Sequence, residues 1–213
     1  MVTVVAMVAV DGVRLLMRAS LPGRGSGVST PPTLAGMSDV DRPPHEHDDA
    51  TADDRVATFW EVARLHAKIT RVPAYFGPTP LESVPPPAWS FGVGTDQADE
   101  LLDLVLAGTK TATASALWEY ETEDEPLPEP GALSIVLDGS GRPRVLIETT
   151  DVEVVPFDEV DDEHARLEGE GDLSLQHWRD AHERFFSDTA SPEQGFVADM
   201  PVVCERFRVL YPD

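Results

Sequence analysis

The chain has 213 residues, of which 41% are hydrophobic and 26% charged, an ordinary composition for one folded domain with its own core. Its formal net charge of −23, from 39 acidic against 16 basic residues, excludes duplex DNA as a partner, because affinity for DNA depends on neutralising phosphates. The single cysteine excludes an intrachain disulfide, a cysteine zinc finger and a CxxC redox site. No run of about 18 uncharged apolar residues predicts a membrane helix, and we expect a cytoplasmic protein.

The charge and the prolines divide the chain into two parts. Residues 1–89 carry 8 basic and 10 acidic side chains and 11 of the 19 prolines, whereas residues 90–213 carry 8 basic and 29 acidic side chains. Residues 1–50 are predicted to be a disordered or non-native N-terminal extension, because the segment 22–36 is rich in Gly, Ser, Thr and Pro. Met37, which follows this segment, is an alternative start of the protein.

Two further patterns in the first 50 residues have simple interpretations. The apolar stretch 2–10 lacks the preceding positive charge of a secretory signal, so no signal peptide is expected. The sequence His-Glu-His-Asp-Asp at 45–49 could hold a metal ion loosely. A solvated polar tail is the favoured interpretation, because nothing rigid holds these ligands together.

The first expected element is a helix over residues 52–69, capped by Thr51 or Asp53. Its apolar residues recur at helical spacing: Val56, Phe59, Trp60, Ala63 and Ala67. The prolines at 78–87 then predict a stiff linker with a polyproline II segment. Residues 51–89 are therefore expected to form a helix and a Pro-rich linker that pack on a domain spanning residues 90–213.

That domain is predicted to begin with a helix over 96–107, capped by Asp96 and followed by Gly108, where a left-handed residue is common. Its expected buried stripe contains Leu101, Leu102, Val105 and Leu106. The acidic run 119–129, with its alternating prolines, predicts a solvated loop or a lid.

The remaining elements alternate between strands and helices. Strands are expected at 110–117, 132–137, 145–155 and 202–211, a hairpin turn at 138–141, and helices at 157–167 and 175–186. Strands that pair through hairpins, with helices packed at one side, predict an α+β fold built on a small mixed barrel or sheet.

The chemistry of the chain points to Lys110. The chain has only two lysines, Lys68 and Lys110, while the other 14 basic residues are arginines. Arginine cannot deprotonate near neutral pH, whereas a desolvated lysine can. Lys110 lies beside the hydroxyl groups of Thr111, Thr113 and Ser115. A neutral lysine next to a threonine can take the hydroxyl proton, so that the oxygen attacks a carbonyl carbon.

A carboxylate is needed to orient the lysine or to handle the leaving-group proton. Glu168, Glu170 and Asp172 offer three carboxylates in a glycine-rich stretch between two expected helices. A neighbouring carboxylate favours the protonated lysine and burial favours the neutral amine, so both states stay open. In the alternative interpretation, Lys110 only caps the C-terminus of a helix.

At this point the sequence resembles the ASCH family (activating signal cointegrator homology), in its bacterial branch. The motifs that carry the resemblance are Phe91-Gly92, DELLDLVLAGTKTATAS, LPEPGALSIVLDGSGRP, IETTDVEVVPFDEV, HARLEGEGDLSLQHWRDAHERFF and VVCERFRVLYP. They cover most of residues 91–211, within the predicted domain 90–213. The resemblance implies a PUA-like fold, a small β-barrel with flanking helices, and a link to RNA and modified nucleosides.

One branch of this family hydrolyses the amide of acetylated cytidine with a Lys, Thr and Glu trio. Its Gly-x-Lys-x-x-Thr pattern falls on Gly108, Lys110 and Thr113, and its glutamate, after His-Ala-x-x, on Glu168. The resemblance therefore implies Lys110 as base, Thr113 as nucleophile and Glu168 as the orienting carboxylate. Two features differ: Ala132 stands where Asp is common, and the EGEGD…WRDAHERFF insert is absent from the compact amidohydrolases.

Further candidates surround this trio. Trp178 and His182 lie four apart on one expected helix, with Arg179 beside them, and could stack a base and contact a phosphate; for Trp178, core packing is the favoured alternative. The substrate-binding candidates are Thr111, Ser115, Glu170, Asp172, Trp178, Arg179 and His182. His164 and Glu168 are spaced for a metal but lack a third ligand, so no metal residues are assigned. Cys204 is expected to be a buried thiol.

Three functions remain open. The chain is expected to be a hydrolase of an acylated nucleoside, with a metal-dependent single-strand ribonuclease or a non-catalytic RNA- or nucleoside-binding module as alternatives. No cofactor is expected, except a divalent metal if the chain is a ribonuclease. The expected partner is a nucleoside or a short single-stranded RNA, with no duplex DNA and no membrane, and the oligomeric state stays open.

Overall fold

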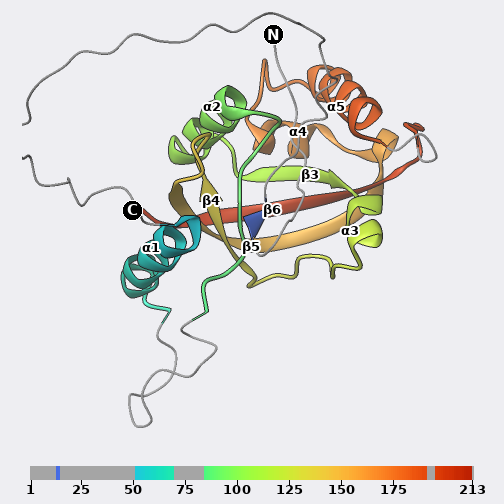
Figure 1. Ribbon diagram of the computed structural model, residues 1–213. Helices are drawn as coiled ribbons and strands as arrows, with labels where there is room; N and C mark the ends of the chain where they lie inside the picture. The colour runs from blue at the N-terminus through green and yellow to red at the C-terminus, as the bar shows by residue number, and fades with distance from the viewer. Residues whose placement is uncertain (1–12, 15–50, 70–83, 191–194, 213) are drawn as a thin grey trace, which may run out of the picture.

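The computed structural model describes residues 13–14, 51–69, 84–190 and 195–212 (Figure 1). Of the extension predicted at 1–50, only residues 13 and 14 lie within this described part. Most of the linker predicted at 78–87 also lies outside it.

One mixed sheet runs through the domain. Its strands are β1 (Val13–Arg14), β2 (Ala88–Trp89), β3 (Ala112–Ala116), β4 (Leu133–Leu137), β5 (Pro143–Pro156) and β6 (Pro201–Tyr211). Their order is β1-β2-β4-β5-β6-β3, with β1, β2 and β4 parallel and the other pairs antiparallel. β5 and β6 form the longest ladder, which two register shifts interrupt.

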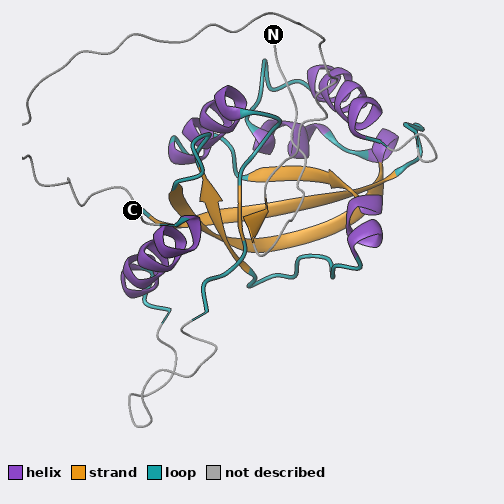
Figure 2. Ribbon diagram, in the orientation of Figure 1, coloured by secondary structure: helices purple, strands orange, loops and turns teal. Residues whose placement is uncertain are grey.

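The sheet is open in the described part of the chain. β3 pairs only with β6 at one edge, and the two-residue β1 pairs only with β2 at the other. Figure 2 shows the curved strands with helices placed around them. The α+β prediction is therefore confirmed, whereas the closed barrel implied by the resemblance is not found, because no ladder joins the two edges.

The helices are α1 (Ala52–His66), α2 (Thr95–Leu106), α3 (Leu117–Glu123), α4 (Asp162–Glu168) and α5 (Leu175–Thr189), with a short 3₁₀ turn, η2 (Phe157–Glu159), before α4. α3 lies partly within the segment predicted as an acidic loop, and this part of the prediction is wrong. Tyr120 is buried and its hydroxyl lies 3.0 Å from Ser115 Oγ. This packing overrides the acidic composition, which alone suggests a solvated loop.

Helix ends differ from the predictions in two places. α2 begins after Gly94 without a side-chain cap, so Asp96 lies in the first turn instead of capping it, and Leu106 at the far end is exposed. The helix expected at 157–167 is divided into η2 and α4, because Asp161 caps α4 by accepting the backbone N–H of His164 at 2.8 Å. Gly108 does adopt the expected left-handed conformation, with φ 72°.

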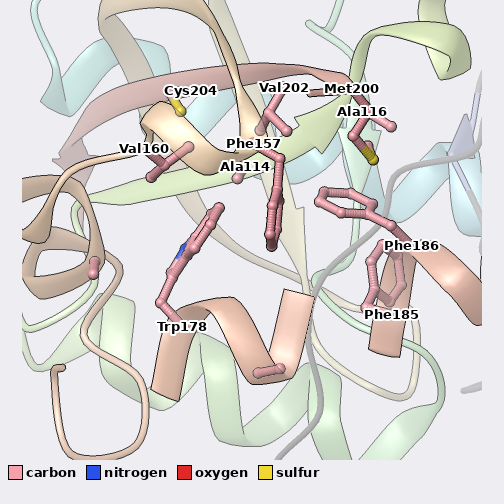
Figure 3. Close-up of a cluster of buried hydrophobic side chains, with 12 residues drawn as sticks. Ala114, Ala116, Phe157, Val160, Trp178, Phe185, Phe186, Met200, Val202 and Cys204 are labelled. Carbon is pink, nitrogen blue, oxygen red and sulfur yellow. The ribbon is translucent and has the colours of Figure 1, made fainter. Parts of the chain in front are cut away.

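Three apolar clusters hold the helices on the sheet. α5 contributes Trp178, Phe185 and Phe186 to a cluster with strands β3 and β6, which also contains Phe157 (Figure 3). α2 packs on β2, β4, β5 and β6 in a second cluster, and α1 packs on β4 and β5 in a third. The first cluster positions α5 beside α4, whose last residue is Glu168.

Candidate functional site

The turn after α2 places Lys110 inside the protein. The backbone N–H groups of Thr109 and Lys110 both donate to the Leu104 carbonyl, at 2.9 and 3.0 Å, and close the helix. The next residue, Thr111, donates its N–H to the Leu167 carbonyl of α4 at 2.8 Å. Because these bonds tie the turn to α4, the long Lys110 side chain enters the interior and has 0% exposure.

A glycine allows the two segments to approach each other. Gly169 ends α4 with φ 74°, and a Cβ atom there would lie 2.6 Å from the Thr109 carbonyl oxygen. No side chain fits at that distance, and the positive φ is itself costly for other residues. Gly169 therefore brings Glu168 and Glu170 next to Lys110.

We expect Gly169→Ala to lower the free energy of unfolding by about 2–4 kcal/mol, since backbone strain and a backbone clash add together. Gly108→Ala is the matched control, because Gly108 has nearly the same φ, 72°, and nothing lies within 4 Å of its Cβ position. The Gly108→Ala control should lower the free energy of unfolding, measured in urea, by only about 1 kcal/mol. Equal losses in both variants would show that the close approach is unimportant.

Lys110 is held by two carboxylates. Its Nζ lies 2.8 Å from Glu168 Oε2 and 2.8 Å from Glu170 Oε1. Glu168 has 0% and Glu170 8% exposure. Nζ also lies 5.4 Å from the centre of the Phe91 ring, within reach of a cation–π interaction. A buried lysine between two acids is a charge cluster that water does not screen.

These contacts determine the protonation of the pair. Burial alone would lower the pKa of Lys110, but the negative charges and hydrogen bonds of Glu168 and Glu170 raise it above its ordinary value of 10.5. Burial would raise the pKa of Glu168, but the positive charge of Lys110 first, and then the neighbouring rings of His182 and His164, hold it well below 4.5. The resting lysine is therefore an ammonium, which answers the question that the sequence left open.

The pair stabilises the fold only while both groups are charged. Glu168 contributes above its unfolded pKa near 4.5 and loses the contribution as pH falls through its lower folded pKa; Lys110 contributes below about 10.5 and loses it as pH rises through its higher folded pKa. We expect the stability difference between the wild type and Lys110→Met/Glu168→Gln to fall by about 2 kcal/mol from pH 6 to pH 3, measured in urea. A difference independent of pH would contradict this.

Three aromatic side chains surround the other oxygen of Glu168. Trp178 Nε1 donates to Glu168 Oε1 at 2.8 Å, and His164 Nε2 lies 3.2 Å from the same oxygen. His182 Nε2 is 3.3 Å away, without the alignment of a hydrogen bond. Both oxygens of the carboxylate are thus occupied, one by Lys110 and one by this aromatic group.

Thr113 lies in β3, opposite Glu205 of β6. Its hydroxyl is buried, at 7% residue exposure, and makes no hydrogen bond within the described residues. The resting structure therefore brings Lys110 and Glu168 together but forms no hydrogen bond from either of them to Thr113. An unpaired buried hydroxyl is costly, and active sites are one of the places where such groups occur.

Comparison with known proteins identifies the family of this chain. A family model described as the ASCH domain matches residues 87–211, more than half of the chain. The chain belongs to the ASCH family.

Two bacterial crystal structures resemble this ASCH protein. A protein from Enterococcus faecalis V583 is 33% identical, with a TM-score of 0.62, covering 73% of this chain and 87% of that one. An ASCH domain from Lactobacillus crispatus JV V101 is 31% identical, with a TM-score of 0.60, covering 71% of this chain and 96% of that one. No curated protein matches this chain.

Of the substrate-binding candidates on α5 of this ASCH domain, Trp178 and His182 are buried in the interior. The third, Arg179, hydrogen-bonds to backbone carbonyl groups of a neighbouring segment. Trp178 stacks on Phe157, at 5.3 Å between ring centres, and on His182, at 3.9 Å. Because the Trp178 side chain is also only 3% exposed, its indole is not open to a base. Arg179 donates to the Asp158 carbonyl at 2.8 Å and the Val160 carbonyl at 3.3 Å.

Of the remaining substrate-binding candidates, Glu170 belongs to the charge cluster with Lys110 and Glu168. The others, Thr111, Ser115 and Asp172, bond to other groups. Thr111 Oγ1 contacts the Leu167 carbonyl at 3.4 Å, and Ser115 Oγ contacts Tyr120. Asp172 is exposed and accepts the Ser174 N–H at 2.9 Å. The role of His164 as a partner of Glu168 was missed, although its spacing of four residues on one helix was a usable signal.

Cys204 is a buried thiol, as expected. Burial first, and then the negative charge of Glu168, raises its pKa far above the ordinary value, which does not suit a nucleophile. Within the described ranges, no group of three His, Cys, Asp or Glu side chains is arranged to hold a metal ion. None of the described helices has the length and apolarity needed to cross a membrane.

Proposed function

We propose that this ASCH protein hydrolyses an acyl amide on a modified nucleoside such as acetylated cytidine, with Thr113 as nucleophile and Lys110 as proton carrier. The observation that carries the proposal is the fully buried Lys110 ammonium between Glu168 and Glu170, three residues before a buried hydroxyl that makes no hydrogen bond. These residues supply the nucleophile, the amine and the carboxylates of an acyl-transfer centre. We include in this proposal that the domain is related to PUA-like domains.

In the first step, Lys110 exchanges a carboxylate for the Thr113 hydroxyl as its hydrogen-bond partner. The Lys110 ammonium gives one proton to a neighbouring carboxylate, and the neutral amine then accepts the Thr113 hydroxyl proton as Oγ1 bonds to the amide carbon. This step requires the amine to exchange a carboxylate for the hydroxyl, since no hydrogen bond joins the two residues at rest. The C–N bond breaks, and the departing amine of the nucleoside takes the proton from Lys110.

In the second step, water adds to the Thr113 ester and releases the carboxylic acid and the free hydroxyl. The threonine proton has passed to the leaving amine and water has restored it, and the carboxylate returns its proton to Lys110, so the resting ammonium and carboxylates are recovered at the end of the cycle. The charge of the protein suits this substrate: the domain segment 90–213 carries 29 acidic against 8 basic residues, which disfavours a long polyanion and tolerates a neutral nucleoside.

The test is incubation of the full chain with acetylated cytidine, followed by chromatography for cytidine and acetate. Release of both, lost in Lys110→Ala, supports the proposal; release that survives this substitution shows that the lysine is not part of the reaction. A parallel incubation with a short single-stranded RNA and manganese tests the ribonuclease alternative, for which the described residues offer no three-ligand site. Salt-sensitive RNA binding without turnover would instead indicate a binding module.

A further inference from the structure

Glu205 is a buried acid outside the trio of the proposed reaction. It lies in β6, directly opposite Thr113 of β3. The side chains of such a pair point to the same face of the sheet, with Cβ atoms about 5 Å apart. The next residues on these strands, Ala114 and Cys204, pack in the α5 cluster on the other face. Glu205 and the Thr113 hydroxyl therefore share the face that is turned away from α5.

Two phenylalanine rings connect this face with Lys110. Phe207 lies two residues after Glu205 on β6, so its side chain points to the same face. Its ring centre is 6.1 Å from that of Phe91, and the Phe91 ring centre is 5.4 Å from Lys110 Nζ. Glu205 and the Lys110 amine therefore lie at opposite ends of one pair of aromatic side chains.

A hydroxyl from a third strand holds the Glu205 carboxyl group. Thr149, in β5, donates its hydroxyl to Glu205 Oε1 at 2.6 Å, and both side chains are buried. Thr113 makes no hydrogen bond within the described residues, so the Glu205 carboxyl group does not accept from it. A carboxyl group has about four acceptor positions, which one hydroxyl does not exhaust. Glu205 is thus a fixed acceptor across the ladder from the proposed nucleophile.

An acyl amide has suitable dimensions to contact both residues. Its carbon comes to about 3–3.5 Å from an attacking oxygen, and its N–H reaches an acceptor at about 2.9 Å. Because carbon and nitrogen are bonded to each other, both contacts are compatible with neighbouring strands about 4.8 Å apart. In acetylated cytidine this N–H is the only hydrogen-bond donor of the base. An acceptor opposite Thr113 therefore suits that group.

We propose that Glu205 contacts the substrate and accepts the N–H of the scissile amide, and that it selects amides that carry this hydrogen. Thr149 is a positioning residue that holds the carboxyl group. The role in turnover rests on the proposed amide hydrolysis. The hydrogen stays on the nitrogen throughout, and the departing amine still takes its other proton from Lys110. Amides with two substituents on nitrogen, and esters, lack this donor, and a site built around a hydrogen bond rejects analogues that cannot form it.

The test compares acetylated cytidine with the same compound carrying a methyl group in place of the amide hydrogen. The wild type should hydrolyse the N–H amide with a kcat/KM at least about 100-fold higher. Glu205→Leu should lower this value about 30-fold for the N–H amide and less than about threefold for the methylated amide, because only the first loses a bond. Thr149→Val should show the same selective loss at about fivefold. Equal losses on both substrates in Glu205→Leu overturn the proposal and leave Glu205 as a structural partner of Thr149.

The neighbouring strand provides a matched control. Glu148 precedes Thr149 on β5, points to the opposite face and accepts from Arg208 at 2.8 Å. Glu148→Leu removes the same charge and should leave both substrates within about twofold of the wild type. If Glu205→Leu does not fold, Thr149→Val/Glu205→Leu removes both members of the hydrogen bond and leaves neither of them unpaired, and the same comparison applies.

Binding distinguishes this contact from the proposed function. Cytidine carries N–H donors on the same nitrogen, whereas cytidine with two methyl groups on that nitrogen has none. In calorimetry, the wild type should bind cytidine at least about tenfold more tightly, and Glu205→Leu should bind both equally. This result without any amide hydrolysis means that the proposed function fails while the contact stands. When no amide is hydrolysed, equal wild-type binding of the two nucleosides, or binding of neither, overturns the contact as well.

Discussion

Replacing Lys110 by methionine should lower the free energy of unfolding at pH 7 by about 3–5 kcal/mol, which urea unfolding will measure. The substitution keeps an unbranched side chain, one atom shorter, but leaves Glu168 and Glu170, at 0% and 8% exposure, without the ammonium that lies 2.8 Å from each. A buried carboxylate without a counter-charge is costly, and protonation relieves that cost. Part of the loss should therefore be recovered as pH falls toward 5.

The chain offers a control for this experiment in its other lysine. Lys68 is exposed at the end of α1, so Lys68→Met removes the same charge without uncovering buried acids. It should change stability by less than about 0.5 kcal/mol. A similar loss in both variants would mean that net charge, and not the buried cluster, determines the effect.

Replacing Thr113 by valine should abolish amide hydrolysis while leaving the fold intact. Removing a covalent nucleophile lowers kcat by on the order of 10³-fold or more. The hydroxyl is buried and makes no hydrogen bond within the described residues, so its removal relieves a desolvation cost and should stabilise the protein by about 1 kcal/mol. A thermal unfolding scan with the cytidine assay measures both effects on one sample.

Ser115→Ala is the matched control, because Ser115 lies two residues further along the same strand and faces the same side. Its hydroxyl contacts Tyr120 at 3.0 Å, so we expect a loss of about 1 kcal/mol in stability and nearly full activity. Full activity in Thr113→Val would remove threonine as the nucleophile. A loss of activity in Ser115→Ala equal to that in Thr113→Val would mean that activity depends on the conformation of β3 and not on the Thr113 hydroxyl itself.

Periodic apolar residues predicted most elements, and the misses have local reasons. α5 and β6 appear where helical spacing and alternation placed them. α3 was missed because its acidic residues and the following prolines suggest solvent, whereas Tyr120 is buried against the sheet. The break between η2 and α4 depends on Asp161, whose side-chain cap competes with a continuous helix.

The site was predicted in part. The scarcity of lysine singled out Lys110, and the glycine-rich acidic stretch offered Glu168, Glu170 and Asp172 as carboxylates. The family pattern then selected Glu168, which lies 58 residues further along the chain. Trp178 and His182 were expected to face a substrate. Their burial behind Glu168 is a property of how α5 packs, and helical spacing alone cannot distinguish a ligand-facing aromatic residue from one that packs inward.

The sequence by itself determined the acidic, single-cysteine α+β domain, the position of its unusual lysine, and the family to which it belongs. Tertiary structure decided that this lysine is an ammonium, because only the folded chain brings Glu168 and Glu170 to 2.8 Å from its nitrogen. Charges far apart in sequence shift each other's protonation only when burial removes the water between them. That juxtaposition depends on packing between α2, α4 and α5, which no local pattern specifies.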